Sequence, residues 1–119
     1  MTKVVYATRS GNVESIIKQL GITDALKIET GQETIDGDYV LFTYNTGQGA
    51  IPKTVATFLE NNPGIKAVIG SGSMARHADT FNGAVDAIVE RYQVPALAKL
   101  DGQGTPEDIV SLKTALADY

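Results

Sequence analysis

Residues 3–20 read KVVYATRSGNVESIIKQL, and the pattern in this stretch indicates the fold class. Its first five residues form a short, mainly apolar run that contains the β-branched Val4 and Val5, which predicts a strand over 3–7. The apolar residues that follow recur at the i, i+3, i+4, i+7 spacing of one helix face: Val13, Ile16, Ile17 and Leu20. Gly21 is placed to end that helix. A strand that runs through a short loop straight into a helix is the opening of an alternating α/β chain.

The same alternation continues to the end of the chain. Further strands are predicted over 25–30, 38–43, 65–70 and 94–100. Helices are predicted over 51–59, with Pro52 in the first turn, over 81–92, and from the Thr105-Pro106 opening to Leu116. The segment Gly31–Gly37 replaces the helix expected between the second and third strands. Parallel strands joined by crossover helices predict an α/β fold: a doubly wound five-stranded sheet with helices on both faces.

Composition narrows the class of protein. The chain has 119 residues, 43% hydrophobic and 20% charged, which predicts one globular domain over 1–119. Zero cysteines exclude a disulfide framework, a thiolate metal site and a catalytic cysteine. His77 is the single histidine, so a multi-histidine metal site is excluded as well.

The net charge and the hydropathy of the chain indicate which partners and which cellular location to expect. The net charge of -4 argues against nucleic acid as a partner. No apolar run approaches the roughly 20 residues of a membrane span, and the first residues do not resemble a signal peptide. We therefore expect no membrane partner and a cytoplasmic location.

Three loops that follow predicted strands are rich in glycine and hydroxyl groups. They span 8–12, 43–49 and 70–77, and parallel strands bring such loops to one edge of the sheet, where α/β proteins bind ligands. The loop 8–12 enters a helix directly, so its amides are predicted to cradle a phosphate. The same residues also suit a capped helix start with a solvated turn. The Walker pattern with its lysine is absent.

Two other families with doubly wound folds are not indicated, because this chain lacks the functional residues that they need. A phosphoacceptor receiver domain needs acidic residues after the first strand and an aspartate ending the third, where this chain has Thr8 and Thr43. A Ser-His-Asp hydrolase is not indicated, because His77 is the only histidine and belongs to no such arrangement.

The loop sequences resemble those of a known family. Thr8-Arg9-Ser10-Gly11-Asn12 is similar to the FMN-phosphate loop of flavodoxins. Residues 43–49 (TYNTGQG), with Pro52 and the FLE of 58–60, resemble the TYTTGFG…P…FLE segment of the ribonucleotide reductase stimulatory proteins, the NrdI family. The YQVP of 92–95 and the KLDGQGTPED of 99–108 look like the end of the same family pattern. The match runs in order over nearly the whole chain.

This resemblance implies a flavodoxin-like fold with strand order 2-1-3-4-5 and an FMN cofactor. It implies a redox protein that activates class Ib ribonucleotide reductase by passing superoxide, made from reduced flavin and oxygen, to the dimanganese small subunit. A flavin-reducing partner is implied too. The phosphate would be held by Thr8, Arg9, Ser10, Gly11 and Asn12. The isoalloxazine would be bordered by Asn45, Thr46, Gly47, Gln48 and Gly49, with Gly72 and Ser73 on its other side. Tyr44, at the start of the same loop, either stacks on the ring or belongs to the hydrophobic core.

Two departures from the family pattern leave alternatives open. Gln48 stands where the family carries an aromatic residue, and the residues after Gly72 differ from its third loop. An aromatic beside the ring contributes about 0.5–1.5 kcal/mol of stacking, so weaker FMN binding is expected. The alternatives are a generic small flavodoxin that shuttles electrons, and a flavin-free binding or assembly factor for the reductase. The expected role is that of an electron-transfer flavoprotein or activase rather than that of a stand-alone catalyst.

Overall fold

A computed structural model describes residues 2–9, 11–44, 50–72 and 82–119 of the chain. The elements along the described chain are β1 (Lys3–Tyr6), α1 (Asn12–Gln19), β2 (Leu26–Lys27), β3 (Tyr39–Tyr44), α2 (Lys53–Asn61), β4 (Ile65–Gly72), α4 (Gly83–Tyr92), β5 (Ala96–Asp101) and α5 (Pro106–Leu116). Strands and helices alternate as the hydrophobic pattern predicts, and residues 31–37, between β2 and β3, form no helix, as the sequence also predicts.

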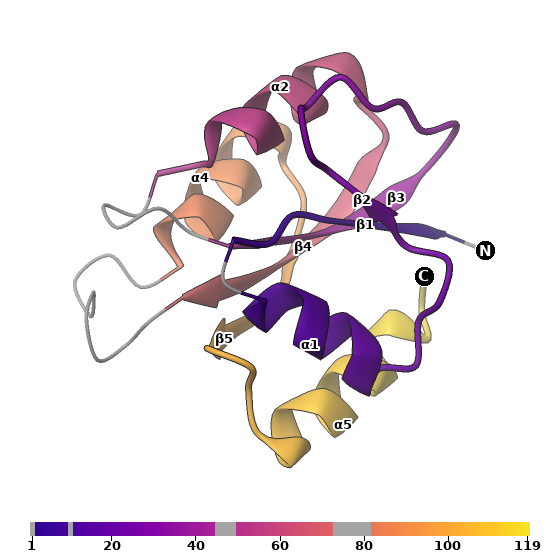
Figure 1. The fold of residues 1–119 in the computed structure, drawn as a ribbon, viewed down its shortest axis with the longest axis vertical. Coiled ribbons are helices and arrows are strands. Elements are labelled where there is room, and N and C mark those ends of the chain that lie inside the picture. Colours follow the sequence, from indigo (N-terminus) through magenta and orange to yellow (C-terminus); the bar gives the residue numbers. More distant parts are fainter. Residues whose placement is uncertain (1, 10, 45–49, 73–81) are drawn as a thin grey trace.

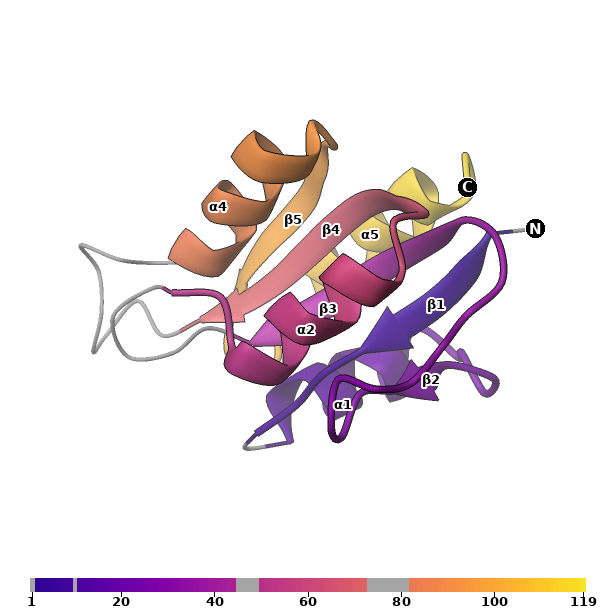
Figure 2. The same ribbon diagram turned by 90° about the horizontal axis from the view of Figure 1, so that it is seen from above.

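All five strands lie in one parallel sheet of order β2-β1-β3-β4-β5, which confirms the predicted topology. Helices α1 and α5 cover one face of the sheet, and α2 and α4 cover the other (Figures 1 and 2). The central strand β3 is buried on both faces, as its continuous apolar run indicates. The carboxyl ends of the strands therefore share one edge, and the amino ends share the opposite edge.

Two hydrophobic clusters fill the space between the sheet and its helices. One cluster packs Val55 and Phe58 of α2 with Val85 of α4. The other packs Ile16 of α1 with Leu112 of α5. These side chains fall on the predicted helical stripes, so burial of one apolar face explains why each helix forms where it does.

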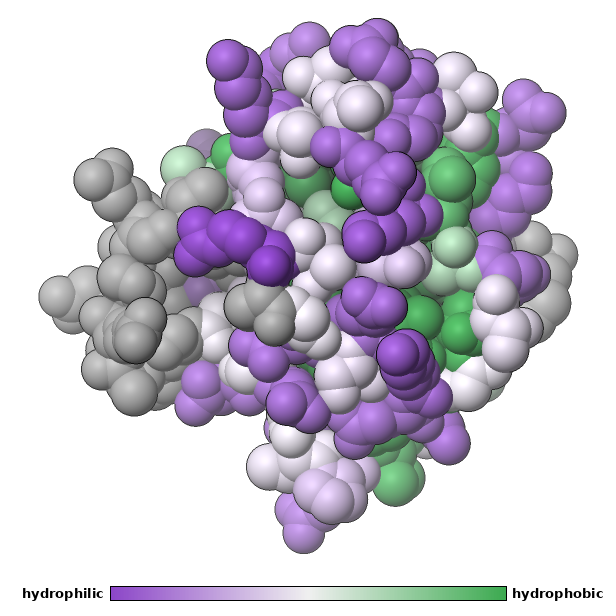
Figure 3. Space-filling view, viewed as in Figure 1, coloured by the Kyte–Doolittle hydropathy of each residue, from purple (hydrophilic) through white to green (hydrophobic). Residues whose placement is uncertain are grey.

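The surface is mainly polar. Hydrophilic side chains predominate on the face shown in Figure 3, with smaller hydrophobic areas between them. Val110 on α5, 65% exposed, is the exposed large hydrophobic side chain among the described residues. Within the described ranges, no helix has the length and apolar character needed to span a membrane.

The prediction of a strand over 25–30 is wrong in length, because β2 covers only Leu26–Lys27. The Ile28 amide still donates to the Tyr6 carbonyl at 2.8 Å. Beyond it the Glu33 carboxylate accepts hydrogen bonds from the backbone amides of Glu29, Thr30 and Gly31 at 2.9–3.1 Å. These bonds to a side chain take the place of a ladder with β1, so the chain turns away from the sheet.

Smaller differences affect two proline-containing boundaries. Pro52 is the N-cap of α2 rather than a residue of its first turn. The strand predicted over 94–100 begins at Ala96, after Pro95, whose carbonyl accepts from the Val68 amide at 3.1 Å. The predicted opening of α5 is confirmed: Thr105 caps the helix, and its hydroxyl and the Asp108 carboxylate form a reciprocal capping box.

Candidate functional site

The carboxyl edge of the sheet brings together those predicted site residues that the structure describes. Tyr6 at the end of β1 pairs with Phe42, and Tyr44 at the end of β3 pairs with Ser71. The described site residues are Thr8, Arg9, Gly11, Asn12, Tyr44 and Gly72. The remaining predicted site residues lie outside the described part of the chain: Ser10, Asn45, Thr46, Gly47, Gln48, Gly49 and Ser73.

The loop between β1 and α1 is closed by a hydrogen bond to the side chain of Thr8. The Gly11 amide donates to the Thr8 hydroxyl at 3.1 Å. Gly11 is the N-cap of α1 with φ +90°, a left-handed conformation that favours glycine. A Cβ atom built there would meet nothing within 4 Å. Conformation therefore requires this glycine, and the space in front of it is open.

The first turn of α1 is left available to an anion. Gly11 provides no side-chain cap, so amides of this turn, at the positive end of the helix dipole, lack the partner that a capping side chain supplies. Helix α5 covers the same face of the sheet and begins at the same edge, but Thr105 and Asp108 cap it from within the protein. Of these two helix starts, the α1 start suits a phosphate group.

A cation lies beside this loop. The guanidinium carbon of Arg9 is 5.6 Å from the ring centroid of Tyr44, within the range of a cation–π contact. Tyr44 is half-buried and packs against both hydrophobic clusters, so its ring has a fixed position. The contact joins the loop after β1 to the end of β3.

Two residues that sequence reasoning did not single out hold the end of β5 against this edge. The Ser71 hydroxyl donates to the Gly102 carbonyl at 2.6 Å, and the Gly102 amide donates to the Gly72 carbonyl at 2.9 Å. The fully buried Asn82, with φ 53°, donates from its side chain to the Leu100 carbonyl at 3.2 Å. The sequence signal that could have identified Asn82 is an asparagine followed by a glycine near the start of a predicted helix, because asparagine tolerates the left-handed conformation.

Further contacts join the β5–α5 turn to α1. The Ser15 hydroxyl donates to the Gln103 side-chain oxygen at 2.8 Å. Lys99 on β5 forms an ion pair with Asp86 in the first turn of α4.

In the ranges that the structure describes, acidic and histidine side chains do not gather into a group that could hold a metal ion. The chemistry that the described residues support is anion binding.

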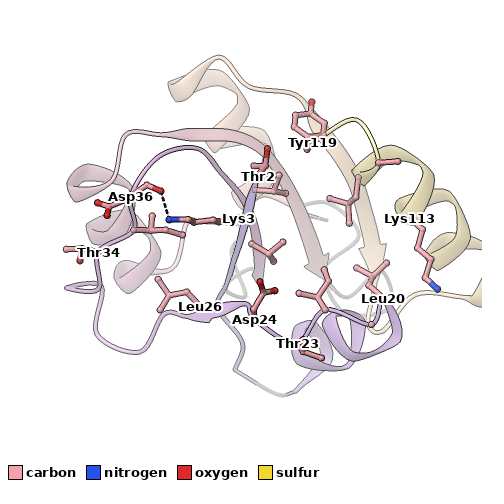
Figure 4. A pocket seen from close by; sticks show the side chains of 17 residues that line it. Thr2, Lys3, Leu20, Thr23, Asp24, Leu26, Thr34, Asp36, Lys113 and Tyr119 are labelled. Atoms are coloured by element: carbon pink, nitrogen blue, oxygen red, sulfur yellow. Dashed lines mark hydrogen bonds between the residues drawn. The ribbon is translucent and has the colours of Figure 1, made fainter.

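A cavity of about 940 Å³ lies at the opposite, amino-terminal edge (Figure 4). Val4, Val40 and Leu116 contribute apolar wall to it. Its lining also contains two lysines and two aspartates: Lys3, Lys113, Asp24 and Asp36. The Lys3 ammonium donates to the Asp36 carbonyl at 2.9 Å. The balanced charges favour no ligand class, and the predicted site residues lie elsewhere.

Comparisons with known proteins point to one family. A family model described as NrdI flavodoxin-like matches residues 4–114. A protein named NrdI from Bacillus licheniformis is 32% identical over 109 residues, which cover 92% of this chain and 82% of the relative. A protein of the same name from Ruegeria sp. is 34% identical over 125 residues, covering 98% and 88%.

A solved structure supports the fold. It is a short-chain flavodoxin associated with a non-canonical PDU bacterial microcompartment, with a TM-score of 0.70 and 23% identity. The match covers 95% of this chain and 91% of that one. At this identity the likeness concerns the arrangement of the strands and helices alone.

Proposed function

The chain belongs to the NrdI family of flavodoxin-like proteins, and from that premise we propose that it binds FMN and activates a class Ib ribonucleotide reductase. The family implies a flavin, which when bound supplies redox chemistry, including the transfer of one electron to oxygen to give superoxide for the dimanganese small subunit. A flavin-reducing protein would be the second partner, and the cytoplasm the place of action.

The observation that carries this proposal is the open start of α1. Gly11 holds a left-handed backbone, no side chain of the described residues caps the helix, and a Cβ there would meet none of their atoms within 4 Å. The amides of the first turn of α1, from Asn12 onward, and the hydroxyl of Thr8 would hold the phosphate. Tyr44 and Gly72, at the ends of β3 and β4, would border the ring. The described residues thus fit the phosphate end of FMN, and the chain's part is to bind and orient the cofactor.

The test compares two glycines of the same conformation at the two ends of α1. Gly11 has φ +90° and Gly21 has φ +76°, and neither would place a Cβ within 4 Å of another atom. Replacing either by alanine costs a similar left-handed strain, about 1–2 kcal/mol. Only Gly11→Ala should weaken FMN binding, by about tenfold or more, as measured by absorbance titration of the folded protein.

The possible results separate the candidate functions. Equal FMN affinity in Gly11→Ala and Gly21→Ala would contradict the proposed cradle. If the folded wild-type protein failed to bind FMN at high micromolar concentration, a flavin-free assembly factor would be favoured, in line with Gln48 in place of an aromatic residue. Tight FMN binding without radical formation on a manganese-loaded small subunit would favour a generic electron carrier.

A further inference from the structure

Arg9 differs from the other arginine that lies over a tyrosine ring in the described structure. Arg91 lies over Tyr92 at 5.7 Å and also forms an ion pair with Glu60 at 3.8 Å. Arg9 lies over Tyr44 at 5.6 Å, and none of the ion pairs among the described residues includes it. Among the described residues, Arg9 therefore has the ring contact without a carboxylate partner.

The contact fixes where this positive charge lies. Arg9 is exposed, and an exposed arginine ordinarily samples many rotamers. The ring of Tyr44 offers a stacking surface that is held in place by both hydrophobic clusters. On the other side, the bond between the Gly11 amide and the Thr8 hydroxyl closes the turn that contains Arg9. The guanidinium therefore lies over the end of β3, on a side chain two residues before the N-cap of α1.

The charge matters because the protein as a whole repels the ligand's phosphate. The chain carries a net charge of -4, and a phosphate monoester carries about -1.5 to -2 at neutral pH. The guanidinium of Arg9, which has no ion-pair partner among the described residues, offsets this repulsion locally, and it can add charge-assisted hydrogen bonds to phosphate oxygens.

We propose that Arg9, positioned by the ring of Tyr44, is the residue that makes this site select phosphorylated over unphosphorylated flavin. The inference rests on the proposed function and goes beyond it. It assigns the choice between FMN and riboflavin to one side chain, whereas the main-chain amides and the glycine make the cradle possible. Tyr44 is a positioning residue here, because it acts on the phosphate through Arg9.

The experiment measures the dissociation constants of FMN and riboflavin for each variant at low salt. The ratio of the two constants is the readout, because any loss of contact with the flavin ring affects both ligands and cancels. Arg9→Gln should weaken FMN binding about tenfold and leave riboflavin binding within about twofold. Arg91→Gln is the matched control, an arginine over a tyrosine away from the cradle, and should leave the ratio unchanged.

Variants of the tyrosine test the positioning role. Tyr44→Phe keeps the ring and should keep the ratio. Tyr44→Leu removes the ring and should shift the ratio toward riboflavin, and adding Arg9→Gln should then change it little further. Arg9→Lys should restore part of the preference. Raising the salt from about 20 mM to about 500 mM should reduce the preference in the wild type more than in Arg9→Gln, because the charge is exposed.

The outcomes separate this inference from the proposed function. If Arg9→Gln weakens FMN and riboflavin equally, Arg9 has a structural role and the inference is wrong. It is also wrong if the wild type binds both flavins equally well, or if Tyr44→Leu leaves the ratio unchanged. If the folded wild type binds neither flavin, the proposed function fails and this inference with it.

Discussion

The buried Asn62, directly after α2, should be a large single contributor to stability. Its side-chain oxygen accepts from the Ile35 amide at 3.0 Å, and its amide group donates to the Glu33 and Phe58 carbonyls at 3.0 Å each. Its own carbonyl accepts from the buried Tyr39 hydroxyl at 2.6 Å. Asn62 is 5% exposed. It therefore attaches the segment between β2 and β3, which has no helix, to the end of α2.

The magnitude of its effect follows from these bonds. Asn62→Leu keeps a similar volume but can neither accept from Ile35 nor donate to Glu33, and both backbone groups are partly buried. A lost hydrogen bond costs about 0.5–1.5 kcal/mol and a buried group left without a partner about 1–3 kcal/mol, so we expect a loss of about 2–4 kcal/mol. Total stabilities of about 5–15 kcal/mol are usual for domains, so this loss is large.

Urea unfolding followed by circular dichroism measures this loss, and Asn61→Leu is the matched control. Asn61 is the exposed neighbour, whose side chain donates to the Gly31 carbonyl at 3.4 Å, and its replacement should cost less than about 0.5 kcal/mol. Hydrogen exchange should show the Ile35 amide opening faster in Asn62→Leu alone. If the two variants differed by less than about 0.5 kcal/mol, Asn62 would not be the attachment point.

Two further predictions concern Glu33 and Gly70. Burial tends to raise the pKa of Glu33, but bonds from the backbone amides of Glu29, Thr30 and Gly31 outweigh it and lower the pKa from 4.5 to about 2. The contribution of the ionised Glu33 carboxylate to the free energy of unfolding is therefore complete above about pH 4.5 and is lost as the pH falls toward 2. In urea unfolding, Glu33→Gln should lower that free energy by about 1 kcal/mol at neutral pH and by much less near pH 2. A Cβ at Gly70 would overlap Val85 and Asn82, so Gly70→Ala should cost about 1–3 kcal/mol in thermal unfolding, and an unchanged melting temperature would contradict this packing.

Local patterns made most of the fold predictable from the sequence. The apolar stripes of α1 and α5 and the capping box at Thr105 depend on residues within a few positions of each other. Strand order followed from the resemblance to flavodoxins, and the structure confirms it. The glycine of the first loop could also be singled out. The sequence places it in a predicted phosphate cradle, and the structure shows in addition that its left-handed φ requires glycine.

The contacts that the sequence did not reveal join distant segments through main-chain groups. Asn62 binds Glu33 and Ile35, and Asn82 binds the Leu100 carbonyl. A carbonyl or an amide is present at almost every position, so the sequence carries no sign of which one a buried asparagine will reach. The short β2 has the same origin, because the Glu33 carboxylate takes the amides that a longer strand would have used.

The positions of these contacts separate stability from binding. Asn62 lies before the start of β4 and contacts Tyr39 at the start of β3, so it acts at the amino edge of the sheet. Arg9 and Gly11 lie at the carboxyl edge, where the loops follow the strands. Effects of distant sites that share no partner are usually additive. Asn62→Leu should therefore lower stability without changing the preference for FMN in the folded fraction, and Arg9→Gln should change that preference with little effect on unfolding. Fold and ligand choice thus depend on opposite ends of the same parallel strands.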